Sequence, residues 1–113
     1  MSRKASGLKA WVLQRATAIY IALFSILLLL VMLLNPPAGY AEWRDWFADP
    51  IIGIATLVFI VAILLHAWVG IRDVMIDYIK PLSLRVVLLA LVALGLLACG
   101  LWASQSLILV RLV

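Results

Sequence analysis

Three long apolar runs, separated by short polar segments, dominate the chain. Residues 16–34, 51–71 and 86–110 contain no Asp, Glu, Lys or Arg. An α-helix rises about 1.5 Å per residue, so roughly 20 apolar residues are enough to cross the hydrocarbon core of a bilayer. Helices also satisfy their own backbone hydrogen bonds in lipid. The pattern therefore predicts an all-α integral membrane protein with three transmembrane helices.

The first polar connection carries a shorter amphipathic pattern. It opens with Asn-Pro-Pro at residues 35–37 and closes with Asp-Pro at residues 49–50, both of which interrupt helices. Between them, apolar aromatic side chains recur at helical spacing opposite charged ones: Trp43, Trp46 and Phe47 against Glu42, Arg44 and Asp45. Because tryptophan favours membrane interfaces, we predict a short helix lying at the outer surface, with ligand binding as an alternative role.

Composition supports a membrane protein and excludes several other classes. The chain has 113 residues, of which 68% are hydrophobic and 12% charged, and a mean hydropathy of +1.25. No polar interval is long enough for a separate domain, so residues 1–113 are expected to form one membrane domain. The pI near 9.7 does not indicate nucleic-acid binding, because the basic residues are scattered at the ends of the apolar runs. Cys99 is the single cysteine, which excludes an internal disulfide and a CxxC metal site.

The basic residues predict the orientation of the three spans. Seven lie before the first span or around the second connection: Arg3, Lys4, Lys9, Arg15, Arg72, Lys80 and Arg85. Two, Arg44 and Arg111, lie on the opposite side. The positive-inside rule then predicts a cytoplasmic N-terminus and a periplasmic C-terminus. The first run could instead be a signal peptide with small residues near Ala38, but its length and the two later spans favour an uncleaved helix.

Small residues on the third span indicate helix packing. Gly95, Cys99 and Ala103 follow one another at intervals of four, with Gly100 and Ser104 alongside. Small side chains at this spacing let a second helix backbone approach closely. A thin three-helix bundle also leaves much apolar surface, which a partner subunit or lipid would cover.

The chain contains one histidine, His66, near the cytoplasmic end of the second span. On a helix at about 100° per residue, Ala62, Gly70, Asp73 and Asp77 fall on roughly the same face. We expect the alanine and the glycine to clear space beside the imidazole, as a flat group such as a porphyrin would require.

Three roles for His66 follow from this setting. A polar side chain in lipid can simply hydrogen-bond to another helix, it can relay protons, or it can ligate haem iron. A six-coordinate haem iron would need a second ligand, from Met32 in a distant span, from Met75 on another face, or from a second chain. A partner that supplies a histidine is the simplest of these solutions.

Two acidic residues and a tyrosine follow the second span. Asp73, Asp77 and Tyr78 would lie at the cytoplasmic interface if the helix continues, either as solvated loop residues or as a functional group. Tyr78 could donate a hydrogen bond to a carbonyl oxygen, and Asp77 could pass protons from water. A quinone that arrives from the bilayer would need both.

The stretch HAWVGIRDVMIDYIKPLSLR, from His66 to Arg85, resembles the signature H-A-W-x-G-x-x-x-V-x-x-D-Y-x-K-P-x-x-L-R of the small hydrophobic membrane anchor of bacterial succinate dehydrogenase. RATAIY, which begins at Arg15, resembles the start of that family's first span. The resemblance covers nearly the whole chain, including the three spans and their order.

The resemblance implies a subunit of respiratory complex II in the bacterial inner membrane. In that family two different membrane anchor subunits hold one haem b between them. They also attach the iron–sulfur and flavoprotein subunits to the cytoplasmic face. Such a chain would have no catalytic activity alone, but would contribute to ubiquinone reduction in the tricarboxylic acid cycle and the aerobic respiratory chain.

The resemblance also assigns roles to individual residues. His66 matches the haem axial ligand, Tyr78 and Asp77 match the quinone-site tyrosine and its neighbouring acid, and Arg15 matches an arginine near the haem propionates. Lys9 and Ala10 stand where some members have a His-Asp pair. The alternatives are a fumarate reductase-type anchor that runs the reaction in reverse, and a small transporter or channel subunit without a redox role.

Overall fold

The computed structural model describes residues 3–112 and is entirely helical within that range, apart from its connections. The predicted single domain of residues 1–113 includes residues 1, 2 and 113, which lie outside the described part. In chain order the helices are α1 (Arg3–Leu34), α2 (Tyr40–Ala48), α3 (Pro50–Tyr78) and α4 (Leu82–Leu112). Three of them, α1, α3 and α4, are long and apolar enough to cross a membrane. The prediction of an all-α protein with three transmembrane helices is thereby confirmed.

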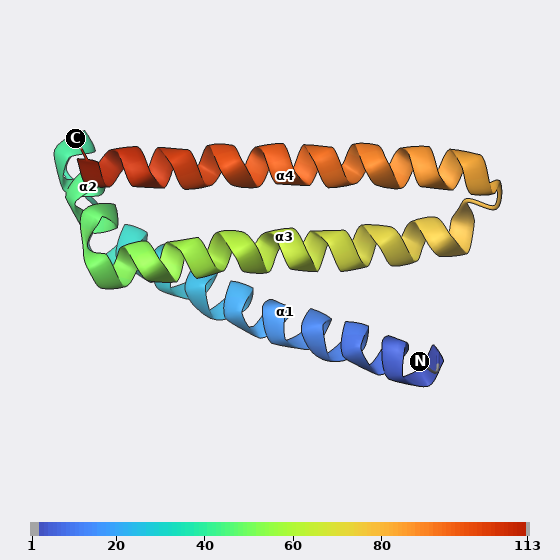
Figure 1. The fold of residues 1–113 in the computed structure, drawn as a ribbon. Coiled ribbons are helices and arrows are strands. Elements are labelled where there is room, and N and C mark those ends of the chain that lie inside the picture. The colour runs from blue at the N-terminus through green and yellow to red at the C-terminus, as the bar shows by residue number, and fades with distance from the viewer. Residues whose placement is uncertain (1–2, 113) are drawn as a thin grey trace.

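Helix α3 lies in the middle of the fold and contacts both other long helices (Figure 1). Helix α4 runs alongside α3, whereas α1 crosses it obliquely on the other side. The short helix α2 packs against α3 and α4 at the end of the bundle where the chain reaches its C-terminus. The N-terminus and the α3–α4 connection lie at the opposite end. Each predicted group of basic residues therefore has its own end of an elongated molecule measuring 51 × 24 × 24 Å.

The three long helices extend beyond the predicted apolar runs 16–34, 51–71 and 86–110. A charged residue ends a hydrophobic run but leaves the backbone hydrogen bonds intact, so each helix continues until its sequence supplies a stop. Helix α1 ends before the Asn-Pro-Pro at residues 35–37, and α3 ends at Tyr78, before Lys80 and Pro81. Asp77 and Tyr78 consequently belong to the last turn of α3 rather than to a loop.

Helix α3 begins at a side-chain cap. The Asp49 carboxylate accepts hydrogen bonds from the backbone N–H groups of Ile51, at 3.0 Å, and Ile52, at 3.2 Å. Pro50 occupies the first helical position, where its missing N–H costs nothing. The predicted interruption between the amphipathic segment and the second span is therefore a tight corner that separates α2 from α3.

Aromatic packing and hydrogen bonds hold α1 against α3. The Tyr20 hydroxyl donates to the backbone carbonyl of Ala55 at 2.6 Å, and the rings of Phe24 and Phe59 lie 4.6 Å apart. Phe24 and Ala62 are buried. Since most other apolar side chains of the described residues stay exposed, the surface of this chain is suited to lipid or to partner chains rather than to water.

Small residues permit close packing of α4 against α3 at one point. A Cβ added to Gly100 would collide with the Leu64 side chain, so the glycine lets this leucine approach the α4 backbone. Gly95, Cys99 and Ala103 are exposed instead, and a Cβ at Gly95 would meet nothing within 4 Å. The predicted close approach is confirmed for Gly100 within the chain, and a partner helix on the Gly95 face remains a prediction.

We predict that Gly100→Val destabilises the α3–α4 packing, because the new side chain must displace Leu64. Overpacking of this kind costs about 1–3 kcal/mol. The midpoint of thermal unfolding of the purified membrane complex, followed by circular dichroism, measures the effect. Gly7→Val is the matched control, since a Cβ at this helical position meets nothing within 4 Å and no partner helix is predicted there. Equal losses in both variants would contradict a specific role for Gly100.

Candidate functional site

The imidazole of His66 lies between α3 and α1 and is half-buried. Its Nδ1 atom is 3.1 Å from the hydroxyl oxygen of Thr17 on α1. No other hydrogen bond of His66 is found within residues 3–112, so Nε2 is free of protein partners there. The structure therefore satisfies one ring nitrogen by an interhelical contact and leaves the other available.

The Thr17 hydroxyl is itself tied to the α1 backbone. Its oxygen lies 2.8 Å from the carbonyl oxygen of Leu13 and 3.1 Å from that of Gln14. Thr17 is only 7% exposed, and among the described residues no other polar side chain is buried to this degree. A hydroxyl in this position is held by its own helix and has little freedom to turn away from the imidazole.

An apolar groove of about 640 Å³ runs along α3 from His66 to the end of the helix. Its lining consists of Gln14, His66, Ala67, Gly70, Ile71, Val74, Met75, Tyr78 and Ile79. Apart from Gln14, every one of these residues lies on α3 or directly after it. The groove is thus a strip of α3 bordered by α1, and none of its lining residues belongs to α4.

The groove joins two of the predicted site residues and leaves out a third. His66 and Tyr78 are about 18 Å apart along the axis at 1.5 Å per residue, so they mark its two ends. Tyr78 is 80% exposed in the last turn of α3, where its phenol is available to a ligand. Asp77 is also exposed but does not line the groove. Asp77 therefore adjoins the Tyr78 end of the groove without forming its wall.

The clearance predicted beside His66 is present at Gly70 only. Gly70 lines the groove, and a Cβ added there would lie 3.3 Å from Nε2 of Gln14. Ala62 is 6% exposed and is not a groove residue, so the prediction that it clears space for a planar group is wrong. The reason is tertiary: α1 crosses α3 on the Ala62 side, and the open side of His66 is turned toward Ala67.

Two polar residues of α1 at this site were missed by the sequence analysis. Thr17 contacts His66, and Gln14 lies one turn earlier with a buried Oε1 atom that has no hydrogen-bond partner. Their spacing of three places both on one helix face. In the sequence, both stand out as polar side chains at the beginning of an apolar run. Only the crossing of α1 over α3 shows which residues they face.

Of the other residues considered as ligands of haem, Arg15 and Met75 lie on the same half of the bundle as the groove, and Met32 does not. Arg15 is exposed on α1, and its guanidinium carbon is 5.5 Å from the centre of the Trp11 ring. Met75 lines the groove, whereas Met32 lies beside α2 at the opposite end. Within residues 3–112, no group of three or more His, Cys, Asp or Glu side chains could hold a metal ion. A metal ion bound to His66 would therefore need further ligands of another kind or from another molecule.

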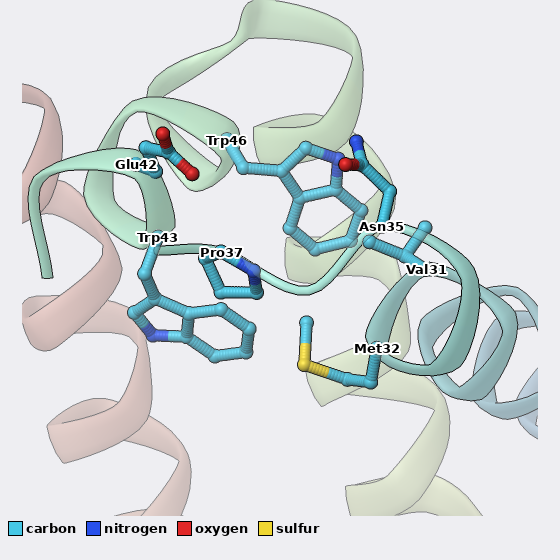
Figure 2. A pocket seen from close by; sticks show the side chains of 7 residues that line it. All are labelled: Val31, Met32, Asn35, Pro37, Glu42, Trp43 and Trp46. Atoms are coloured by element: carbon cyan, nitrogen blue, oxygen red, sulfur yellow. The ribbon is translucent and has the colours of Figure 1, made fainter. Parts of the chain in front are cut away.

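A second, smaller cavity of about 230 Å³ lies at the α2 end (Figure 2). It is lined by Val31, Met32, Asn35, Pro37, Glu42, Trp43 and Trp46. The Glu42 carboxylate accepts the backbone N–H of Ala38 at 2.8 Å. The rings of Trp43 and Trp46 each lie within 4.8 Å of Phe47. These contacts confirm the predicted amphipathic helix and give its polar and aromatic residues a structural role.

Comparison with known proteins relates the whole chain to one family. Residues 1–105 match the family model of the succinate dehydrogenase/fumarate reductase transmembrane subunit. The succinate dehydrogenase hydrophobic membrane anchor subunit of Coxiella burnetii (strain RSA 493 / Nine Mile phase I) is 33% identical over 105 residues, which cover 93% of this chain and 91% of the relative. The protein of the same name from Rickettsia conorii (strain ATCC VR-613 / Malish 7) is 37% identical, with 79% and 71% covered.

The fold defines a multi-pass, all-helical membrane protein whose apolar surface far exceeds its buried core. By these matches the chain belongs to the succinate dehydrogenase/fumarate reductase transmembrane subunit family, among the hydrophobic membrane anchor subunits of succinate dehydrogenase. The resemblance in the stretch from His66 to Arg85 is thereby confirmed at the level of the family.

Proposed function

We propose that the chain anchors succinate dehydrogenase to the bacterial inner membrane, holds haem b jointly with a second anchor subunit, and forms part of the ubiquinone reduction site. The observation that carries this proposal is the setting of His66. One ring nitrogen contacts Thr17, the other has no protein partner among the described residues, and the ring lines an open apolar groove. A neutral imidazole nitrogen with a free lone pair is a suitable axial ligand for haem iron.

The residues around His66 fit a ligand that is shared between two chains. The groove is apolar, open and lined by no residue of α4, so a second helical subunit could cover a macrocycle bound in it. The chain offers one imidazole, and Met32 lies at the other end of the bundle. The second axial ligand would therefore come from the partner anchor subunit. When bound, the haem supplies an iron centre that exchanges one electron at a time.

The cytoplasmic end of the groove is the proposed site of ubiquinone reduction. A quinone that enters from the bilayer would pack on Val74 and Ile79, with its carbonyl oxygen accepting a hydrogen bond from the Tyr78 hydroxyl. Two electrons from the iron–sulfur subunit and two protons convert ubiquinone to ubiquinol. Asp77 is exposed to water beside this position and would pass protons toward it.

Charge at the same end supports the assembly of the complex there. Arg15 is exposed near the beginning of the first span, where a guanidinium would pair with the haem propionates. The iron–sulfur and flavoprotein subunits would dock at this cytoplasmic face. Succinate oxidation would take place in them, and this chain would contribute only to quinone chemistry.

Two alternatives lead to different expectations. A fumarate reductase-type anchor would use the same architecture to pass electrons from menaquinol to the partner subunits. A small transporter or channel subunit would bind no haem, so its purified complex would lack a b-type spectrum. The interhelical contact of His66 agrees with a purely structural histidine, but the free ring nitrogen in an open groove favours ligation.

We predict that His66→Ala removes or disturbs the haem absorbance while the chain still inserts, because the ligand is lost but the apolar helices remain. The tagged chain is purified from membranes in detergent. Its reduced-minus-oxidised spectrum measures the haem, and its recovery from the membranes with the co-purifying subunits shows that it still inserts and assembles. Met75→Leu is the control, since it changes a potential iron ligand in the same groove. An unchanged spectrum in the His66 variant would count against the ligand assignment.

We predict that Tyr78→Phe lowers quinone reductase activity at least about tenfold more than succinate oxidation by an artificial acceptor, because the phenol acts only on the quinone. Loss of a positioned hydrogen bond to a reacting group is typically worth a factor of about 10²–10³. Tyr40→Phe, at the opposite end of the bundle, is the control and should change neither activity. Equal losses in the two assays would remove Tyr78 from the quinone site.

We predict that a reporter fused after residue 113 lies in the periplasm, because seven of the nine basic residues lie at the opposite end of the spans. A reporter that works only in the periplasm should therefore be active, and one that works only in the cytoplasm should not. Alkaline phosphatase and green fluorescent protein fusions give opposite readouts. Fluorescence with inactive phosphatase would reverse the orientation.

A further inference from the structure

The contact between Thr17 and His66 has a consequence for the chemistry of the imidazole. We infer that Thr17 is a positioning residue that sets the tautomer and the orientation of His66, so that Nε2 is presented to the metal. This inference rests on the proposed role of His66 as a haem ligand. It adds a residue of α1 to a site whose proposed iron ligand and quinone residues all lie on α3.

The hydrogen-bond inventory of the hydroxyl determines the direction of the bond. A threonine hydroxyl has one proton to donate and two lone pairs. Its oxygen lies 2.8 Å from the Leu13 carbonyl oxygen and 3.1 Å from that of Gln14, and neither of these atoms can donate. Donation to the nearer Leu13 carbonyl is favoured, because two oxygen atoms 2.8 Å apart repel each other unless a proton lies between them. The lone pairs then face Nδ1 of His66 at 3.1 Å.

An oxygen lone pair next to Nδ1 favours the tautomer that carries its proton on this atom. In a neutral imidazole the other nitrogen, Nε2, then holds the lone pair. A metal-bound histidine generally donates its second N–H to a nearby acceptor, which fixes the ring and raises its basicity as a ligand. Thr17 supplies this acceptor from a neighbouring helix.

Burial makes the contact more constraining than a surface hydrogen bond. Thr17 is 7% exposed, and His66 is half-buried at the α1–α3 contact. The low exposure of Thr17 limits the access of water to this contact, and the Thr17 oxygen is the hydrogen-bond partner found for the ring among the described residues. The hydroxyl is also held by its own helix backbone, as is common for threonine within a helix. The acceptor is therefore in position before any ligand binds.

The test compares two substitutions of Thr17 in the complete membrane complex. Thr17→Val keeps the shape and removes the acceptor, whereas Thr17→Ser keeps the acceptor and removes a methyl group. The readouts are the haem midpoint potential, the low-spin ferric electron paramagnetic resonance signal, and the rate of haem transfer to excess apomyoglobin. None of these depends on enzymatic turnover.

We expect Thr17→Val to raise the haem potential, to shift the low-spin signal and to speed haem loss by about 10–100-fold, the usual effect of removing such a partner. The potential should rise because an imidazole without a hydrogen-bond acceptor donates less electron density and stabilises the ferric state less. Thr17→Ser should stay close to the unsubstituted complex in all three measurements.

Tyr20→Phe is the control for general loosening of α1. It removes a different hydrogen bond between α1 and α3, from the Tyr20 hydroxyl to the Ala55 carbonyl, and no hydrogen bond of Tyr20 with His66 is found among the described residues. The inference predicts that this variant keeps the haem potential and the resonance signal. Equal shifts in the Tyr20 and Thr17→Val variants would overturn the inference, because the effect would then belong to helix packing.

Two further outcomes are separable. If the complex contains haem and Thr17→Val leaves all three readouts unchanged, the positioning role of Thr17 is refuted and the ligand role of His66 stands. If the unsubstituted complex contains no haem, the proposed function itself fails.

Discussion

A single imidazole within an apolar helix imposes the constraint on which the site depends. A polar ring at membrane depth needs partners, and here Thr17 on α1 supplies one for Nδ1 of His66. That contact, the hydrogen bond from Tyr20 to the Ala55 carbonyl, and the packing of Phe24 on Phe59 all lie along the α1–α3 contact. The same interface that assembles the fold therefore orients its one histidine.

Because α3 lies between α1 and α4, it packs against a helix on each flank but keeps one part of its surface uncovered. Its two flanks are occupied by neighbouring helices, with Gly100 allowing Leu64 to approach α4 closely. The strip from His66 to Tyr78 stays open as an apolar groove. Few side chains of the described residues are buried, which is expected of a subunit whose surface is completed by lipid and by other chains.

The candidate site residues occupy two parts of one helix, the middle and the last turn of α3. His66 lies within the apolar part of α3, where a bound group would be shielded from water. Tyr78 and Asp77 lie in its last turn, where both side chains are exposed. Under the proposed function, α3 would connect a ligand position shielded from water with a proton source in contact with water, and the helix would set the distance between them. A membrane anchor of succinate dehydrogenase would use this separation to pass electrons within the protein while taking protons from the cytoplasm.

The sequence alone determined the class of the protein, the three spans and the helical connection, because charge-free apolar runs and proline stops act locally. It also singled out His66, Tyr78 and Asp77, and a family signature carries their proposed roles. It did not determine which side of α3 is open. Ala62 and Gly70 share a helix face with His66, yet Ala62 is buried and Gly70 lines the groove. It also did not reveal Thr17 or Gln14 as neighbours of the histidine. Those facts depend on where α1 crosses α3, and a crossing angle is set by side-chain packing between distant segments rather than by periodicity within either one.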